Sequence, residues 1–311
     1  MSDPTLSLVF PGQGSQAVGM GRALADAYPA ARAVFDEVDE ALGQKLSAVM
    51  WDGPQDVLTL TVNAQPALMA HAVAAWRALE AEGFGLAQVR SLAGHSLGEY
   101  AAHCVAGTYT LADTARLLRA RGEAMQSAVP VGEGGMAAIL GLDMDAVEAL
   151  VAGTPCEVAN DNAPGQVVIS GPTDAVEAAC AAAKAEGAKR ALALPVSAPF
   201  HCRLMAPAAD KMRAALASVT PQKPGKPIFA NTLAAPVPPG DIADSLVAQV
   251  TGRVRWTETI IAMTADGTDT FLELGPGKVL SGLIRRTRRD AKTLAVGAPD
   301  DIDAVRDALQ H

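Results

Sequence analysis

Short apolar runs that end in glycine-rich turns recur along this chain, and they constrain its fold more than any other feature. LSLVF at 6–10 precedes the turn PGQGSQ, and TFLELGPGKVL at 270–280 repeats the pattern. VRSLAGHS at 89–96 and KPIFAN at 226–231 have the same character. Strands that are separated by helices pair in parallel, in a sheet with both faces covered. The pattern therefore predicts an α/β fold built on a parallel sheet.

The middle of the chain breaks this pattern. After the flexible connector PVGEGG at 130–135, the predicted order is strand, helix, strand, strand, helix, strand, ending at RALALPV. This split βαβ order can form a small sheet of its own. We predict a small inserted domain at 129–198 and a large domain built from 1–128 and 199–311. A cleft is expected between the two domains, where ligands commonly bind.

Composition excludes several classes of protein. The 311 residues carry a formal net charge of −9, which argues against nucleic acid or an anionic membrane as a partner. No apolar run reaches the length of about 18 residues that spans a membrane, and the first residues are unlike a signal peptide. We therefore expect a cytoplasmic protein. The four cysteines form no CxxC and the histidines form no HExxH, so no metal site is expected.

Ser96 lies in a G-x-S-x-G motif, between a predicted strand and a predicted helix. This is the context of a nucleophile elbow, where side chains at Gly94 and Gly98 would collide with neighbouring backbone. The N-terminus of the following helix favours developing negative charge. A serine that merely caps the helix would give a similar pattern, so both interpretations stay open.

A serine nucleophile needs a base, and the chain offers five histidines. Four of them are unsuitable because of their places in the predicted elements: His71, His95, His103 and His311. His95, for example, should point to the side opposite Ser96. His201 remains, in the loop SAPFHC where the chain returns to the large domain, and is the best candidate for the base.

The segment TLADTARLLRARGEAMQ predicts a helix that begins at a capping box of Thr110 and Asp113. Leu118 and Met125 lie on its apolar face, and Arg121 lies within about 60° of the centre of that face. A buried guanidinium is costly unless a carboxylate meets it. Arg121 therefore forms either an internal ion pair or a two-pronged pair with a carboxylate of the substrate.

The turn FPGQGSQA offers a competing interpretation, because its glycines after a strand match a dinucleotide fingerprint. The next segment, YPAARAVFDEVDEAL, is helical in pattern and is not the second strand that the fingerprint needs. We therefore discount a nicotinamide or flavin site. The N–H groups of Gln13 and Leu97 could instead stabilise an oxyanion, and a purely structural turn is the alternative.

Residues 284–289, IRRTRR, form the densest positive patch of this acidic chain. The patch is either a solvated helix end or a docking point for an acidic partner or phosphates.

Seven motifs occur in the order seen in the malonyl-CoA:acyl carrier protein transacylases, the acyltransferases of bacterial fatty-acid synthesis. They are FPGQGSQ, GHSLGEY, RARGEAMQ, NDNAPGQVVISG, APFHCRLM, VRW and ELGPGKVL. The chain resembles this family over roughly residues 5–285. The resemblance implies an α/β-hydrolase-like large subdomain with an inserted ferredoxin-like small subdomain. It also implies transfer of malonyl from CoA to the phosphopantetheine thiol of acyl carrier protein.

By this resemblance Ser96 would attack the malonyl thioester in a ping-pong route through a malonyl-serine ester. His201 would act as general base and then acid, oriented by a backbone carbonyl, here that of Gln249. Arg121 would bind the malonyl carboxylate, and the N–H groups named above would form the oxyanion hole. Arg253 stands where the family usually has a proline, which puts the turn beside Gln249 in question.

The resemblance implies further substrate contacts, and the corresponding residues are Met125, Asn160, Asn162 and Phe200. Phe200 is bulky, which favours unbranched malonyl. The CoA thioester is the substrate, no cofactor is expected, and the protein is expected to be a monomer. Carrier protein could dock at the basic patch, at Arg285, Arg286, Arg288 and Arg289. A serine esterase or thioesterase with the same elbow is the alternative activity, and a scaffold that binds the carrier without catalysis is a third.

Overall fold

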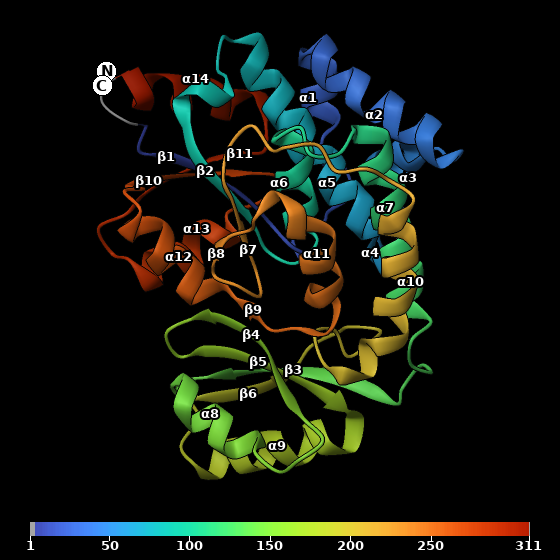
Figure 1. Cartoon of the computed structure of the whole chain (residues 1–311), viewed down its shortest axis with the longest axis vertical. Helices are drawn as coiled ribbons and strands as arrows, with labels where there is room; N and C mark the ends of the chain where they lie inside the picture. Colours follow the sequence, from blue (N-terminus) through green and yellow to red (C-terminus); the bar gives the residue numbers. More distant parts are fainter. Residues whose placement is uncertain (1–3, 311) are drawn as a thin grey trace.

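The computed structural model describes residues 4–310, which form two sheets flanked by helices (Figure 1). The larger sheet has six strands in the order β11-β10-β1-β2-β7-β8, and all neighbours pair in parallel except β7 and β8. Its strands are β1 Leu6–Phe10, β2 Val89–Gly94, β7 Ile228–Ala230, β8 Ala235–Pro236, β10 Thr270–Leu274 and β11 Lys292–Val296. The predicted parallel sheet is present, and a short antiparallel strand extends its edge.

Alternation along β1 sends side chains to both faces of this sheet, and both faces are covered. Leu8 and Phe10 join the main apolar cluster on one face, whereas Val9 joins a second cluster on the other. The main cluster contains residues of α1 Arg22–Ala27, α2 Pro29–Leu42, α3 Leu46–Asp52, α4 Gln55–Thr59, α5 Thr61–Ala81, α6 Gly98–Val105, α7 Leu111–Gln126, α10 Ala206–Ala217, α11 Ile242–Thr251 and α14 Pro299–Gln310. The second cluster contains residues of α12 Trp256–Ala265 and α13 Val279–Thr287. Three short 3-10 helices lie in the connections: η1 Leu86–Gln88, η2 Arg203–Met205 and η3 Pro239–Asp241.

The smaller sheet has five strands in the order β6-β3-β5-β4-β9 and is antiparallel apart from the β4–β9 pair. Its elements are β3 Gly134–Leu140, α8 Met144–Val151, β4 Glu157–Ala163, β5 Gln166–Pro172, α9 Thr173–Ala185, β6 Arg190–Ala193 and β9 Val254–Arg255. A separate apolar cluster joins α8 and α9 to this sheet, and Figure 1 shows both helices on its outer side. The mixed α/β fold is confirmed. One strand, β9, comes from outside the predicted insertion at 129–198, and the division into domains stays a prediction.

None of the helices described between residues 4 and 310 is both long and apolar enough to cross a membrane.

Candidate functional site

A tight turn between β2 and α6 carries Ser96. Its backbone φ is +53°, a left-handed conformation that residues other than glycine rarely adopt. A Cβ on Gly94 would lie 1.9 Å from the carbonyl carbon of Gly98, and a Cβ on Gly98 would lie 2.2 Å from the carbonyl oxygen of Phe10. The collision predicted for these two glycines is confirmed. The turn therefore has the geometry of a nucleophile elbow, with the serine at the carboxyl end of a parallel strand.

Ser96 and His201 are in hydrogen-bond contact, with 2.8 Å between Oγ and Nε2. The other ring nitrogen of His201, Nδ1, lies 3.0 Å from the carbonyl oxygen of Gln249 and 3.2 Å from that of Gly252. Since both of these partners are acceptors, Nδ1 carries the proton and Nε2 is free to accept the serine proton. Backbone carbonyls thus occupy the position that an acid holds in a catalytic triad.

The electrostatic surroundings keep His201 neutral. Burial and, to a smaller extent, the positive charge of Arg121 lower the pKa of His201 to about 3. A neutral imidazole at physiological pH is the form that can act as a general base.

Arg121 is fully buried on α7, 1% exposed, and its guanidinium reaches the serine. Nη2 donates to Ser96 Oγ at 3.1 Å and to the side-chain Oε1 of Gln249 at 2.9 Å, and Nη1 donates to Oε1 of Gln65 at 2.7 Å. Within residues 4–310 no carboxylate forms an ion pair with Arg121, and its Nε has no acceptor. The alternative of an internal ion pair is therefore wrong, and the guanidinium can accept a carboxylate from outside.

A cavity of about 370 Å³ surrounds these groups. The predicted residues that line it are Gln13, Ser96, Leu97, Arg121, Met125, Asn160, Asn162, Phe200 and His201. Gln249 lies behind the wall, buried, and acts on the cavity through its partners. Apart from His95, the remaining lining residues were not predicted: Gly14, Gln16, Thr59, Gln65, Met136, Val168, Leu194, Pro195 and Val196.

The prediction that His95 points away from the serine is wrong. His95 lines the same cavity, where its Nε2 lies 2.8 Å from Oδ1 of Asn162, and its ring packs against Trp256. The prediction assumed the alternation of a regular strand, but the left-handed residue that follows changes the direction of the chain. His95 forms its hydrogen bond with Asn162 across the cavity and not with Ser96.

The two residues proposed as oxyanion donors, Gln13 and Leu97, line the cavity. Within the described part of the chain, neither the N–H of Gln13 nor that of Leu97 donates to a protein acceptor. The side chain of Gln13 is fixed in addition, because its Oε1 accepts a hydrogen bond of 2.9 Å from Thr61. Two unpaired donors beside a nucleophile are suited to bind a developing negative oxygen.

Two residues that hold the elbow were not predicted from the sequence. Asn231 accepts a hydrogen bond from the N–H of Ser96 at 2.7 Å through its Oδ1 and donates to the carbonyl of Gly94 at 2.6 Å. Glu99 is a fully buried acid on α6 that accepts from the N–H of Asn231 at 3.0 Å. Its place directly after the G-x-S-x-G motif, among buried helix positions, was the one available hint.

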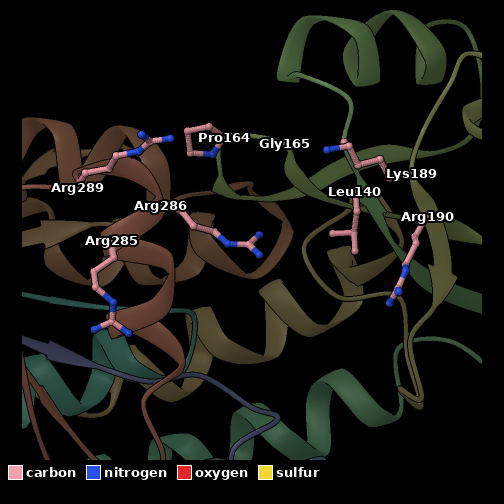
Figure 2. A pocket seen from close by; sticks show the side chains of 9 residues that line it. Leu140, Pro164, Gly165, Lys189, Arg190, Arg285, Arg286 and Arg289 are labelled. Carbon is pink, nitrogen blue, oxygen red and sulfur yellow. The ribbon is translucent and has the colours of Figure 1, made fainter.

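The basic patch lines a second cavity of about 690 Å³ between α13 and the smaller sheet. Figure 2 shows three arginines of the α13 segment on one wall and Leu140, Lys189 and Arg190 across from them. The three arginines are Arg285, Arg286 and Arg289. Arg288 was predicted with them but does not line this cavity.

The substitution near Gln249 has a visible consequence. Arg253, which replaces the proline usual in the family, forms an ion pair of 2.6 Å with Glu148 of α8. The carbonyl of Gln249 still meets His201, so the turn keeps its orienting contact. Among residues 4–310 no group of three or more histidine, cysteine, aspartate or glutamate residues is placed to hold a metal ion.

Comparisons with known proteins show what the whole chain is similar to. A family model described as an acyl transferase domain matches residues 7–304. A malonyl CoA-acyl carrier protein transacylase of Bacillus subtilis is 43% identical over 312 residues, 98% of this chain and 98% of the relative. The crystal structure of an acyl-carrier-protein-S-malonyltransferase from Bartonella henselae is 53% identical, with a TM-score of 0.95 over 98% of this chain and 99% of that chain. A solved complex of a type II PKS acyl-carrier protein with its malonyl-transacylase matches at 40% identity and a TM-score of 0.93, covering 97% and 99% of the two chains.

Proposed function

The chain belongs to the malonyl-CoA:acyl carrier protein transacylases of the acyl transferase domain family, and from that premise we propose how its residues move the malonyl group. The enzyme is an acyl-carrier-protein S-malonyltransferase. Its substrates are malonyl-CoA and acyl carrier protein. The roles of individual residues below, the monomeric state and the cytoplasmic location stay predictions.

In the first half-reaction, the malonyl carboxylate binds to the guanidinium of Arg121 and the thioester carbonyl oxygen faces the N–H groups of Gln13 and Leu97. Oγ of Ser96 attacks the carbonyl carbon while Nε2 of His201 takes its proton. The tetrahedral intermediate collapses, the carbon–sulfur bond breaks, and the imidazolium returns the proton to the CoA sulfur. Malonyl-serine and CoA thiol are the products.

In the second half-reaction, the phosphopantetheine thiol of the carrier enters the position that CoA has left. Nε2 of His201 takes the thiol proton, the sulfur attacks the ester carbonyl, and the proton returns to Oγ of Ser96 as the ester breaks. The two large carriers never need to occupy the cavity together, which is the advantage of a covalent route.

Binding of malonyl also prepares the base. The charge of Arg121 is one of the causes that hold the pKa of His201 down. A malonyl carboxylate on the guanidinium offsets that charge, so the imidazole becomes more basic when the correct substrate is bound. An acyl group without a carboxylate leaves the pKa of His201 low and the serine less activated.

The walls of the cavity favour a small acyl group. Met125 and Phe200 lie beside Arg121 and His201 in the lining, and Met136, Val168 and Leu194 add further apolar surface. These bulky side chains favour unbranched malonyl and leave little room for a substituent.

The basic patch is proposed as the docking surface for the carrier. Arg285, Arg286 and Arg289 face Lys189 and Arg190 across the second cavity, and no acid is among its lining residues. Opposite charges at such a surface speed encounter and set orientation. Arg288, which does not line the cavity, is left out of this docking surface.

One observation carries the proposal: Oγ of Ser96 is 2.8 Å from the base and 3.1 Å from the guanidinium, so nucleophile, base and carboxylate site meet at one atom. To test it, the enzyme is incubated with malonyl-CoA and the intact protein is weighed by mass spectrometry. We expect one malonyl ester on the native chain and none on Ser96→Ala.

The same experiment separates transfer from hydrolysis. Carrier protein is added to the malonyl-enzyme, and malonyl-carrier is compared with free malonate. We expect malonyl-carrier to dominate. Free malonate as the main product would support the esterase alternative, and no ester at all would favour a non-catalytic scaffold.

A further inference from the structure

Glu99 is a buried acid next to the reaction centre that the mechanism above does not use. Its side chain is 0% exposed. Oε2 accepts two hydrogen bonds, from the N–H of Asn231 at 3.0 Å and from Nε2 of Gln249 at 2.8 Å, whereas Oε1 has no partner. A buried carboxylate with one free oxygen is costly in its ionised form, so its presence calls for a compensating positive charge.

Both partners of Glu99 hold the backbone of Ser96. Oδ1 of Asn231 accepts from the N–H of Ser96 at 2.7 Å, and Nε2 of Gln249 donates to the carbonyl of Ser96 at 3.0 Å. The acid therefore holds the backbone of Asn231 and the side-chain amide of Gln249, the two residues that keep the left-handed Ser96 in place. This makes Glu99 a positioning residue, because it acts on the nucleophile through other groups.

The amide of Gln249 also links Glu99 to Arg121. Oε1 of this amide accepts from Nη2 of Arg121 at 2.9 Å, and Nε2 of the same amide donates to Glu99. A positive and a negative group thus lie at the two ends of one polarised amide, and their charges act on each other without direct contact. In the free enzyme this arrangement offsets the charge of the guanidinium while leaving it open to a ligand.

We propose that Glu99 is the internal counter-charge of Arg121, transmitted by the Gln249 amide, and that it takes up a proton when the malonyl carboxylate binds. The inference rests on the proposed role of Arg121 as the malonyl site. Once a second carboxylate shares the guanidinium, the two negative charges repel each other in a buried site. The malonyl carboxylate is fixed by the substrate, so Glu99 becomes neutral, and the proton comes from solvent.

The other titratable groups of the site do not supply that compensation. Burial raises the pKa of Tyr100, and burial lowers the pKa values of His95 and His201, so all three are neutral near pH 7. Glu99 differs from them, because burial raises its pKa to about 7 against the opposing effect of Arg121. Among these groups, Glu99 is the one whose pKa a nearby charge can shift through the physiological pH range.

Proton uptake is measured by calorimetric titration of Ser96→Ala at pH 8, in two buffers that differ in ionisation enthalpy. The ligands are malonyl-CoA and acetyl-CoA, which share the same phosphates and differ in the carboxylate. A group with a pKa of about 7 is roughly 0.9 ionised at pH 8. We therefore expect malonyl-CoA to take up as much as about 0.9 proton per site more than acetyl-CoA.

The outcomes distinguish this inference from the proposed function. Tighter binding of malonyl-CoA than of acetyl-CoA, with equal proton uptake, overturns the role of Glu99 and leaves that of Arg121 standing. Equal binding of the two ligands overturns the carboxylate site on Arg121 and the inference with it. The measurement keeps Glu99 itself, so it decides the matter even if a substitution at this position prevents folding.

Kinetics give a second, independent test. Ionised Glu99 weakens malonyl binding, so the KM of the native enzyme should rise by as much as about thirtyfold from pH 6 to pH 8.5. Glu99→Gln, which keeps an oxygen for both donors, should have a low KM across this range. Asp39→Asn is the matched control, because it neutralises another buried acid, one bound to Ser47 on α3, and should follow the native profile.

A merely structural Glu99 gives a different result. Its replacement would then lower stability or kcat but leave the pH profile of KM like that of the native enzyme. The same rise in KM in Glu99→Gln and native enzyme therefore overturns the proposal.

Discussion

Replacing Arg121 by alanine should convert a malonyl-selective enzyme into one that scarcely distinguishes malonyl from acetyl. The native guanidinium is buried and donates to Gln65, Gln249 and Ser96. These hydrogen bonds fix its orientation, and its remaining N–H groups are available to a carboxylate. Breaking a buried charge pair costs about 3–5 kcal/mol. At about 1.36 kcal/mol for each factor of ten, kcat/KM for malonyl-CoA should fall roughly 10²- to 10⁴-fold.

Acetyl-CoA provides the internal reference, because it has no carboxylate to lose. The alanine variant also loses the contact with Ser96 Oγ, which should slow both substrates, by roughly 10- to 150-fold for one hydrogen bond from a charged donor. The ratio of the two kcat/KM values therefore isolates the carboxylate. It is measured by offering both thioesters together and weighing the acyl-enzymes by mass spectrometry.

Two control variants complete the design. Arg116→Ala removes an exposed arginine of the same helix, paired with Asp113, and should leave the ratio unchanged. Arg121→Lys keeps the positive charge but lacks the planar guanidinium that binds a carboxylate through two hydrogen bonds. It should give an intermediate ratio of the two kcat/KM values. If Arg121→Ala slowed both thioesters by the same factor, the carboxylate site would be refuted, even though the residue mattered for activity.

Three further predictions concern other parts of the chain. Arg286→Glu should slow transfer to the carrier about tenfold, in a manner that depends on salt, whereas Arg116→Glu should not; equal rates would remove the patch from docking. Gly98→Ala should lower Tm by about 5 °C or more because its Cβ meets the β1 carbonyl, whereas Gly135→Ala, with 3.9 Å of clearance, should fold normally. With its pKa lowered to about 3, His201 stays neutral in acid, so kcat/KM for malonyl-CoA should not fall between pH 7.5 and 5.5. A tenfold loss over that range would indicate an ordinary histidine.

The sequence predicts features that depend on neighbouring residues. Glycines on both sides of Ser96 indicate the elbow, because the collisions they avoid arise within a few residues. The helical period places Arg121 inward, and its burial agrees. Thr110 caps its helix as predicted, since its side chain accepts from the N–H of Asp113. Local geometry determines each of these features.

Features that join distant segments could not be predicted in this way. Glu99 and Gln249 are 150 residues apart, and neither segment contains a pattern that predicts their hydrogen bond. His95 was misplaced because strand alternation does not continue through a residue with positive φ. The strands β8 and β9 have two residues each, too few to show any period. Only the folded chain brings these parts together.

The strand β9 has a consequence for any attempt to divide the protein. It pairs with β4 through Asn160 and Asp161, so the outermost strand of the smaller sheet is supplied by a segment more than sixty residues beyond β6. A fragment that contains only the predicted insertion, 129–198, would leave the backbone groups on one edge of β4 unpaired. Exposed edge strands of this kind pair with strands of other molecules. The excised piece should therefore self-associate unless residues 254–255 are restored to it.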